Sequence, residues 1–273
     1  MRYRIATDKP LEDISDTSYS HEIWNKQLAN LRAKLGEDGV TWFKVDWLFA
    51  ECYMYRRIVG MTAKSKYLKS FDYFLEQKVE GFNAHLGQIH DCINYLLLAS
   101  QDVSKQKQRE ALEVMLKMCL WGNRCDLSLS CGGPSKLAIS QVESARMLDS
   151  YILCDNFGAA IDSYLLNLKP GNKGSRQLHI VLDNTGPELL GDLILAEFLM
   201  GAKLVDKTVL HGKEYPYFVS DVTGNDFEWT LRELNKQGGV YQKLYEKLSE
   251  RVKKGELVYQ DHRFWTYFIR TAK

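Results

Sequence analysis

The sequence predicts an α/β protein with a helical N-terminal region and a C-terminal domain built on a parallel sheet. In the first 120 residues, apolar side chains recur with helical spacing, and no run there indicates a convincing strand. After residue 120, short apolar runs alternate with a helical segment, which is the order that a parallel sheet requires. The chain has 273 residues and only 5 Pro, so it is long enough to bury a sizeable core and contains few helix breakers. We therefore expect a helical region at 1–120 and an α/β domain at 121–273.

Two helix starts are marked by residues that commonly cap helices. Ser20 precedes an amphipathic segment that Gly36 ends, and Asp46 precedes another one at 47–59. The aromatic residues of the second segment are typical of a buried helix face, with Glu51 among them. Further helical periodicity covers residues 67–75, 84–99 and 108–120.

The second half contains a strand, a helix and a strand in succession. Residues 178–182 form a short apolar run between turn signals, as a buried parallel strand does. A turn at 184–187 then leads into an apolar helix at 188–200. The remaining expected elements are strands at 207–210 and 217–220, a helix at 227–252, a strand at 257–259, and turns at 132–134 and 170–172.

Charge and cysteine usage narrow the class of protein. There are 36 Lys and Arg against 35 Asp and Glu, a formal charge of +1, and 45% of the residues are apolar. This balance excludes a nucleic-acid coat, an acidic tail protein and a disordered chain. The six cysteines form no C-x-x-C pair, and no apolar stretch follows Met1 or reaches the ~20 residues that a bilayer requires. We therefore expect a cytoplasmic or nuclear protein with reduced thiols and no membrane partner.

Acidic residues follow two of the expected strands. Asp183 comes directly after 178–182, and Asp221 comes directly after 217–220. Ligands of open α/β sheets bind at the carboxyl ends of strands, so the two carboxylates should lie close together. Asn184 adds an amide oxygen, and this set of hard oxygen donors suits Mg²⁺ or Mn²⁺ better than Zn²⁺. Glu188 begins the following helix, where it could face the same site.

A simpler interpretation of these residues stays open at this point. Asp and Asn are common turn formers, and residues 183–186 would also serve as the N-terminal cap of the next helix. Similarly, Asn123 and Asp126 either line a site or only stop the preceding helix. The sequence has no G-x-S-x-G elbow, no G-x-x-x-x-G-K-[ST] loop and no G-x-G-x-x-G turn, so serine hydrolases and the common phosphate loops lack support.

Four motifs taken together resemble a known family. They are Trp-Leu-Phe-Ala-Glu-Cys-Tyr with Tyr-Arg-Arg (47–53 and 55–57), Trp-Gly-Asn-Arg-Cys-Asp-Leu-Ser (121–128), Leu-Asp-Asn-Thr-Gly-Pro-Glu (182–188) and Phe-Val-Ser-Asp (218–221). In this order they resemble the metal-dependent damage-control phosphatases. The resemblance is greatest to the eukaryotic sugar-phosphate phosphatases that are also described as acidic-residue methyltransferases.

The resemblance implies a fold, an activity and a set of site residues. The fold would be a Rossmann-like α/β/α core with a helical N-terminal region. The activity would be hydrolysis of sugar phosphate monoesters such as fructose 1-phosphate and fructose 6-phosphate. It would depend on Mn²⁺ or Ni²⁺, with Co²⁺ or Mg²⁺ as alternatives. By the family motifs, the metal ligands would be Asp183, Asn184 and Asp221. Substrate-binding residues would be Glu188, Asn123, Asp126, Glu51, Arg270 and Lys273, and the catalytic residues would be Asp183 and Lys273.

The C-terminal region departs from the family pattern. Residues 270–273 match the family's Arg-Thr-x-Lys motif, whose cations would offset charge on the phosphoryl group. In the family, however, several dozen residues that include a substrate loop precede this motif, whereas here only residues 267–269 separate it from the stretch at 261–266. We therefore expect a shortened C-terminal region and weakened or lost turnover. Two alternatives stay open: a protein carboxyl methyltransferase that uses S-adenosylmethionine, and an inactive short form that keeps the metal site.

Overall fold

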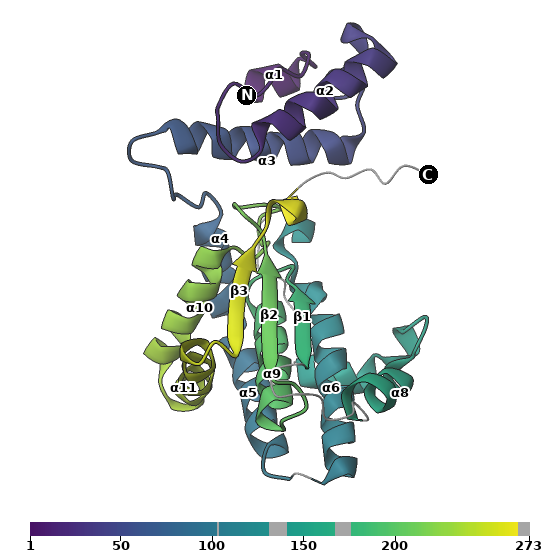
Figure 1. Cartoon of the computed structure of the whole chain (residues 1–273), viewed down its shortest axis with the longest axis vertical. Helices are drawn as coiled ribbons and strands as arrows, with labels where there is room; N and C mark the ends of the chain where they lie inside the picture. The colour runs from purple at the N-terminus through teal and green to yellow at the C-terminus, as the bar shows by residue number, and fades with distance from the viewer. Residues whose placement is uncertain (103, 131–140, 167–175, 267–273) are drawn as a thin grey trace. The chain divides into compact units, whose positions relative to one another are not determined.

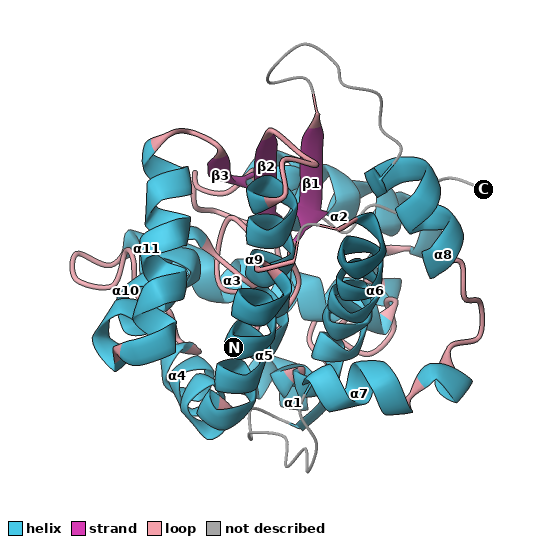
Figure 2. Ribbon diagram, turned by 90° about the horizontal axis from the view of Figure 1, so that it is seen from below, coloured by secondary structure: helices cyan, strands magenta, loops and turns pink. Residues whose placement is uncertain are grey.

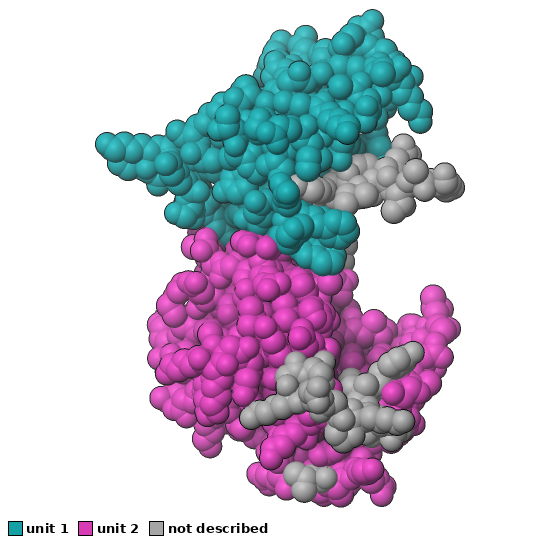
Figure 3. All heavy atoms as spheres, viewed as in Figure 1, with its two compact units in different colours: residues 1–73, 214–218, 262–273 teal, residues 74–213, 219–261 magenta. Residues whose placement is uncertain are grey.

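The computed structural model describes residues 1–102, 104–130, 141–166 and 176–266, and it divides into two compact units (Figure 3). Unit 1 comprises residues 1–73 and 214–218 with the chain from 262 onward. Unit 2 comprises residues 74–213 and 219–261. The expected turns at 132–134 and 170–172 lie outside the described residues.

Unit 1 is helical. Its helices are α1 (Arg2–Ala6), α2 (His21–Leu35) and α3 (Trp47–Lys64) (Figure 1). Helix α2 begins after Ser20 and ends at Gly36, at φ 76°, as predicted, but the Ser20 side chain makes no capping hydrogen bond. The carboxylate of Asp46 accepts a hydrogen bond from the Leu48 amide, which caps α3. Trp24 of α2 packs against Phe49 and Tyr53 of α3, so aromatic rings form the core of this unit.

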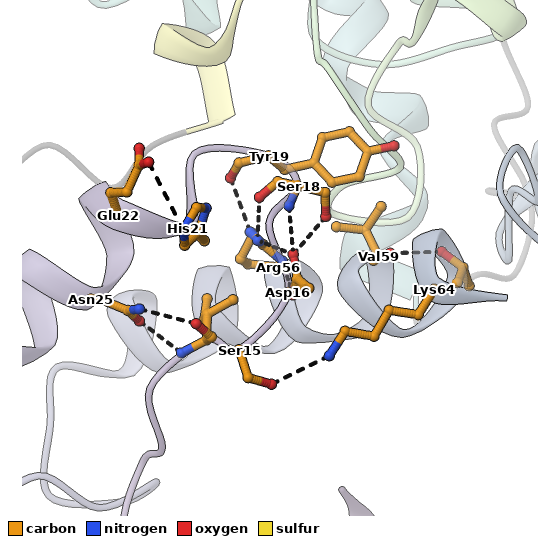
Figure 4. Close-up of polar contacts among 12 residues, drawn as sticks. Ser15, Asp16, Ser18, Tyr19, His21, Glu22, Asn25, Arg56, Val59 and Lys64 are labelled. Carbon is orange, nitrogen blue, oxygen red and sulfur yellow. Dashed lines mark hydrogen bonds and ion pairs between the residues drawn. The ribbon is translucent and has the colours of Figure 1, made fainter.

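A buried ion pair holds the segment before α2 against α3 (Figure 4). The Arg56 guanidinium donates to both carboxylate oxygens of Asp16, at 2.6 and 3.1 Å, and to the main-chain carbonyls of Ser18 and Tyr19. A side chain at Gly60 would collide with this pair, because an added Cβ would lie 2.3 Å from an Asp16 oxygen. The pair therefore requires glycine one turn further along α3.

Unit 2 combines helices with a parallel sheet (Figures 1 and 2). Its helices are α4 (Leu75–Ala84), α5 (Leu86–Ala99), α6 (Lys105–Gly122), α7 (Gln141–Met147), α8 (Phe157–Ala160), α9 (Pro187–Gly201), α10 (Gly224–Gln237) and α11 (Gly239–Lys253). Its strands are β1 (Gln177–Val181), β2 (Lys207–Gly212) and β3 (Leu257–Asp261), in the order β1-β2-β3 with both pairings parallel. The predicted α/β class is confirmed.

Helix α9 forms the centre of unit 2. Every residue from Pro187 to Met200 is buried, as its all-round apolar sequence predicts. Helices α5 and α6 pack against α9, which itself crosses over from β1 to β2. Among the described residues, these helices lie on one face of the sheet (Figure 1), while Gln177, His179 and Val181 are exposed along β1. The core therefore lies between the sheet and α9.

Three predicted elements are wrong in detail. Of the helix expected at 67–75, only Leu75 is helical, as the first residue of α4, because Tyr67, Leu68 and Phe71 are exposed and give a helix no face to bury. The expected helix at 227–252 is two helices, separated by Gly238 and Gly239 with φ of 71° and 57°.

The third error is the strand expected at 217–220. This segment is a turn with positive φ at Phe218 and Val219. Aromatic contacts replace the sheet here: the rings of the buried Tyr217 and the partly buried Phe218 lie 5.4 and 5.1 Å from that of Tyr55.

The compact units also divide the chain differently from the expected boundary at 120. Helices α5 and α6 precede that boundary, yet they pack on α9 and belong to unit 2. No helix in the described ranges is both long and apolar enough to cross a membrane.

Candidate functional site

The segment that joins β1 to α9 carries three candidate residues. Asp183 and Asn184 follow β1, and Glu188 lies in the first turn of α9. Gly186, with φ 76°, makes the tight entry to the helix, and Pro187 occupies a position where its missing N–H costs nothing. No side chain caps this helix. The segment is thus a turn that leads into the helix with Gly186 as its N-cap residue and with the Leu189 amide donating to the Asn184 carbonyl, whereas the side chains of Asp183 and Asn184 are not used as caps.

Asp221 reaches this segment through backbone pairing of two loops. Asn184 and Asp221 form an isolated antiparallel bridge. The Val222 amide donates to the Asp183 carbonyl at 2.8 Å, and the Thr185 amide donates to the Ser220 carbonyl at the same distance. The two acidic residues therefore come together although only one of the two strands predicted before them exists.

The end of α6 brings Asn123 to the same place. Gly122 permits this approach, because a Cβ there would lie 2.9 Å from the Glu188 Cα. The Asn123 amide donates to Asp183 Oδ2 at 3.2 Å and to Glu188 Oε2 at 3.5 Å. The Asn184 amide donates to the same two oxygens, at 3.2 and 2.9 Å. Two amides thus orient two carboxylates.

Two further residues belong to this cluster, although sequence reasoning did not single them out. The buried Ser220 hydroxyl lies 2.5 Å from Asn184 Oδ1 and 3.1 Å from Asp126 Oδ1, and it accepts from the Leu127 amide. The Lys213 ammonium lies 3.2 Å from Asp221 Oδ2. Ser220 is next to Asp221 in the fourth motif, and that position could have identified it from the sequence. No motif or pattern in the sequence pointed to Lys213.

The acids of the cluster have pKa values above those of ordinary carboxyl groups. Burial raises the pKa of Asp221 to about 7, and the charge of Asp183 adds to the rise while Lys213 opposes it. Burial likewise raises the pKa of Glu188 to about 7, with a hydrogen bond from Asn184 in opposition. The pKa of Asp183 is also raised, first by lost hydration and then by the charge of Asp126, against the pull of Lys213. The cluster thus carries more potential negative charge than its cations offset.

The donor chemistry of the cluster suits a hard divalent cation. Asp183 and Asp221 supply carboxylate oxygens, and the Asn184 carbonyl oxygen retains a second lone pair beside its bond from Ser220. No group of three His, Cys, Asp or Glu side chains in a metal-binding arrangement occurs within the described ranges.

Three of the predicted site residues are not among those that the structure places in this cluster. Glu51 belongs to unit 1, where its carboxylate accepts from the Tyr55 hydroxyl at 3.1 Å. Arg270 and Lys273 lie outside the described residues. The structure therefore brings together Asp183, Asn184, Asp221, Glu188, Asn123 and Asp126.

Sequence comparisons identify the family of the chain. The profile of the damage-control phosphatase ARMT1-like domain matches residues 1–273. Proteins named damage-control phosphatase ARMT1 from Xenopus laevis and Homo sapiens are each 34% identical to the chain, over 273 and 274 residues. The protein of that name from Rattus norvegicus is 36% identical over 279 residues. Each alignment covers 97% of this chain and 62% of the relative, so the chain spans less than two thirds of the length of these relatives. Since the family profile matches its full length, the chain belongs to the ARMT1-like damage-control phosphatase domain family.

Proposed function

We propose that the chain is a metal-dependent phosphatase that hydrolyses sugar phosphate monoesters, with fructose 1-phosphate and fructose 6-phosphate as first candidates. The observation that carries the proposal is the cluster of Asp183, Asp221 and Glu188 after β1, whose carboxyl groups have raised pKa values because nearby cations do not compensate their burial. Family membership and the name of the relatives support phosphatase activity in general. Small phosphorylated metabolites of the cytoplasm, and of the nucleus, would be its substrates.

Asp183, Asn184 and Asp221 would hold the cation. Mn²⁺ or Ni²⁺ is the first choice, and Co²⁺ or Mg²⁺ also fits oxygen donors. A bound divalent cation would supply Lewis-acid polarisation of the phosphoryl oxygens. The negative cluster alone would repel a phosphate dianion, so the proposed cation also makes substrate binding electrostatically possible.

The remaining side chains would orient the reactants. Asn123 and Asn184 direct Glu188 Oε2, whose carboxyl group can hold or release a proton near neutral pH. The Ser220 hydroxyl fixes Asn184 and Asp126 relative to each other. From the sequence motif alone, Arg270 and Lys273 would offset the charge of the transferring phosphoryl group.

The first test is phosphate release from fructose 1-phosphate by the purified chain, with Mn²⁺ and with a chelator. We expect release that needs the metal and that falls about a thousandfold or more in Asp183→Ala, because that variant loses a ligand of the polarising ion. Asp91→Ala, which removes an exposed carboxylate on α5, is the matched control and should keep full activity.

Other outcomes select among the alternatives. Full activity in Asp183→Ala would exclude the assigned site. Thermal stabilisation by Mn²⁺ without phosphate release would indicate an inactive form that keeps its metal site. Modification that needs S-adenosylmethionine and no metal would favour the carboxyl methyltransferase.

A further inference from the structure

A buried lysine contacts the loop that carries Asp221. Lys78 lies in α4 with 2% of its surface exposed. Its ammonium donates to Asp226 Oδ2 at 2.7 Å and to the main-chain carbonyl of Asp221 at 3.1 Å. A buried ammonium needs partners to offset its lost hydration, and apolar residues in place of such a pair often stabilise a fold equally well. Stability alone therefore gives little reason for a lysine here.

The partner of Lys78 organises the same loop. Asp226 Oδ2 also accepts from the Thr223 amide at 2.8 Å and from the Thr223 hydroxyl at 2.7 Å, and the Asp226 amide donates back to that hydroxyl. These bonds form the capping box of α10. Lys78 thus joins α4, the start of α10 and the carbonyl of Asp221.

The other side of the loop is tied to the segment after β1. Asp221 is bridged to Asn184, and the next amide, of Val222, donates to the Asp183 carbonyl. The main chain at Asp221 is therefore held both by two other candidate ligands and, through Lys78 and Asp226, by α4 and the start of α10.

The two lysines near Asp221 contact different groups. Lys213 contacts the carboxylate, which is where a cation would bind, whereas Lys78 contacts the main-chain carbonyl. A cation at the carboxylate competes with Lys213 and leaves the Lys78 contact intact. Of these two lysines, only Lys78 can therefore help to set the position of Asp221 both with and without a cation.

We propose that Lys78 is a positioning residue of the metal site, which sets the place of Asp221 through its main-chain carbonyl and the Asp226 carboxylate. This inference rests on the proposed function, because it concerns a ligand of the same site. Ligand sets tolerate displacements of only about half an ångström, so loosening one ligand weakens cation binding even when the protein remains folded.

The test separates positioning from folding with two variants. Lys78→Met removes the ammonium but leaves the Asp226 charge buried without compensation. Lys78→Met/Asp226→Asn also removes that charge, while the amide oxygen can still accept from Thr223. We expect the double variant to regain most of the stability that the single variant loses, measured by urea unfolding. Its Mn²⁺ affinity, measured by calorimetry on the metal-free protein, should stay at least tenfold weaker than that of the unsubstituted chain. Affinity that returns together with stability would overturn the inference.

Two controls distinguish this inference from the metal site itself. Arg251→Met breaks the ion pair with the buried Glu197 near the other end of α9, and it should lower stability without changing Mn²⁺ affinity. Asp221→Asn should bind Mn²⁺ far more weakly than the unsubstituted chain. If it binds equally well, or if the unsubstituted chain binds no Mn²⁺, the proposed site fails and the inference with it. If Asp221→Asn loses binding but the double variant does not, only the role of Lys78 fails.

Discussion

The two units each contain a buried aspartate, and the two carboxyl groups behave in opposite ways. Burial alone would raise the pKa of Asp16 in unit 1, but hydrogen bonds from Arg56 and Ser18 outweigh it and lower the pKa to about 2. In unit 2, burial and the neighbouring Asp183 raise the pKa of Asp221 to about 7, despite Lys213. A bidentate guanidinium outweighs the burial of Asp16, whereas the lysines near Asp221 do not outweigh its burial.

This difference separates a structural carboxylate from one suited to binding. Asp16 has all its charge offset inside the protein, so it anchors a segment and has nothing left to offer a ligand. The acids around Asp221 lack such compensation, and a divalent cation would supply it. A raised pKa thus marks the unit in which chemistry is proposed.

The largest effect is expected from breaking the compensated pair in unit 1. Arg56→Met should cost about 3–5 kcal/mol of unfolding free energy, because it leaves Asp16 buried and uncompensated. Urea unfolding measures this loss. Arg57→Met is the control on the next residue of α3, whose half-exposed contact with Glu12 should contribute less than about 1 kcal/mol. Equal losses in the two variants would show that the Asp16 charge is not the cause.

A pH-dependent effect is expected from an uncompensated acid of unit 2. Burial raises the pKa of Asp192, one turn beyond Glu188 in α9, from 3.8 to about 7. Between those values the folded protein binds more protons at this group than the unfolded chain, so its contribution to stability is present below about pH 4 and is lost as the pH rises through about 7.

Asp192→Asn should remove that dependence, because the amide resembles the neutral acid. The slope of unfolding free energy against pH should flatten by on the order of 1 kcal/mol per pH unit in this window. Urea unfolding at several pH values measures the slope, with Glu250→Gln, an exposed acid paired with Lys254, as control. An unchanged slope in Asp192→Asn would contradict the raised pKa.

The smallest effect is expected from the hydroxyl that links the acids of unit 2. Ser220→Ala removes one group bonded to Asn184, Asp126 and the Leu127 amide, and it should cost about 1–2 kcal/mol of unfolding free energy. Ser100→Ala, whose half-buried hydroxyl donates only to the carbonyl one turn earlier, should cost less. A larger loss in Ser100→Ala than in Ser220→Ala would remove Ser220 from the network.

Much of the fold could be predicted because its signals are local. The Asp46 cap, the Gly36 stop and the apolar runs that became β1, β2 and α9 each depend on residues a few positions apart. The same local order placed Asp183, Asn184 and Glu188 together between a strand and a helix. The error at 217–220 shows the limit of this reasoning, since an apolar run can be buried by aromatic rings as well as by a sheet.

By itself, the sequence determined the α/β class, most of the helices and strands, and the acids that follow β1, because periodicity and capping act over one or two turns. Only the tertiary contacts bring Lys78 to Asp221 and Asp226 across more than 140 residues, Asn123 to Asp183, and Ser220 to Asn184. The tertiary structure also determines that the pKa of Asp16 is lowered and that of Asp221 is raised. Such contacts and pKa shifts depend on burial and on partners distant in sequence, and no local pattern carries that information.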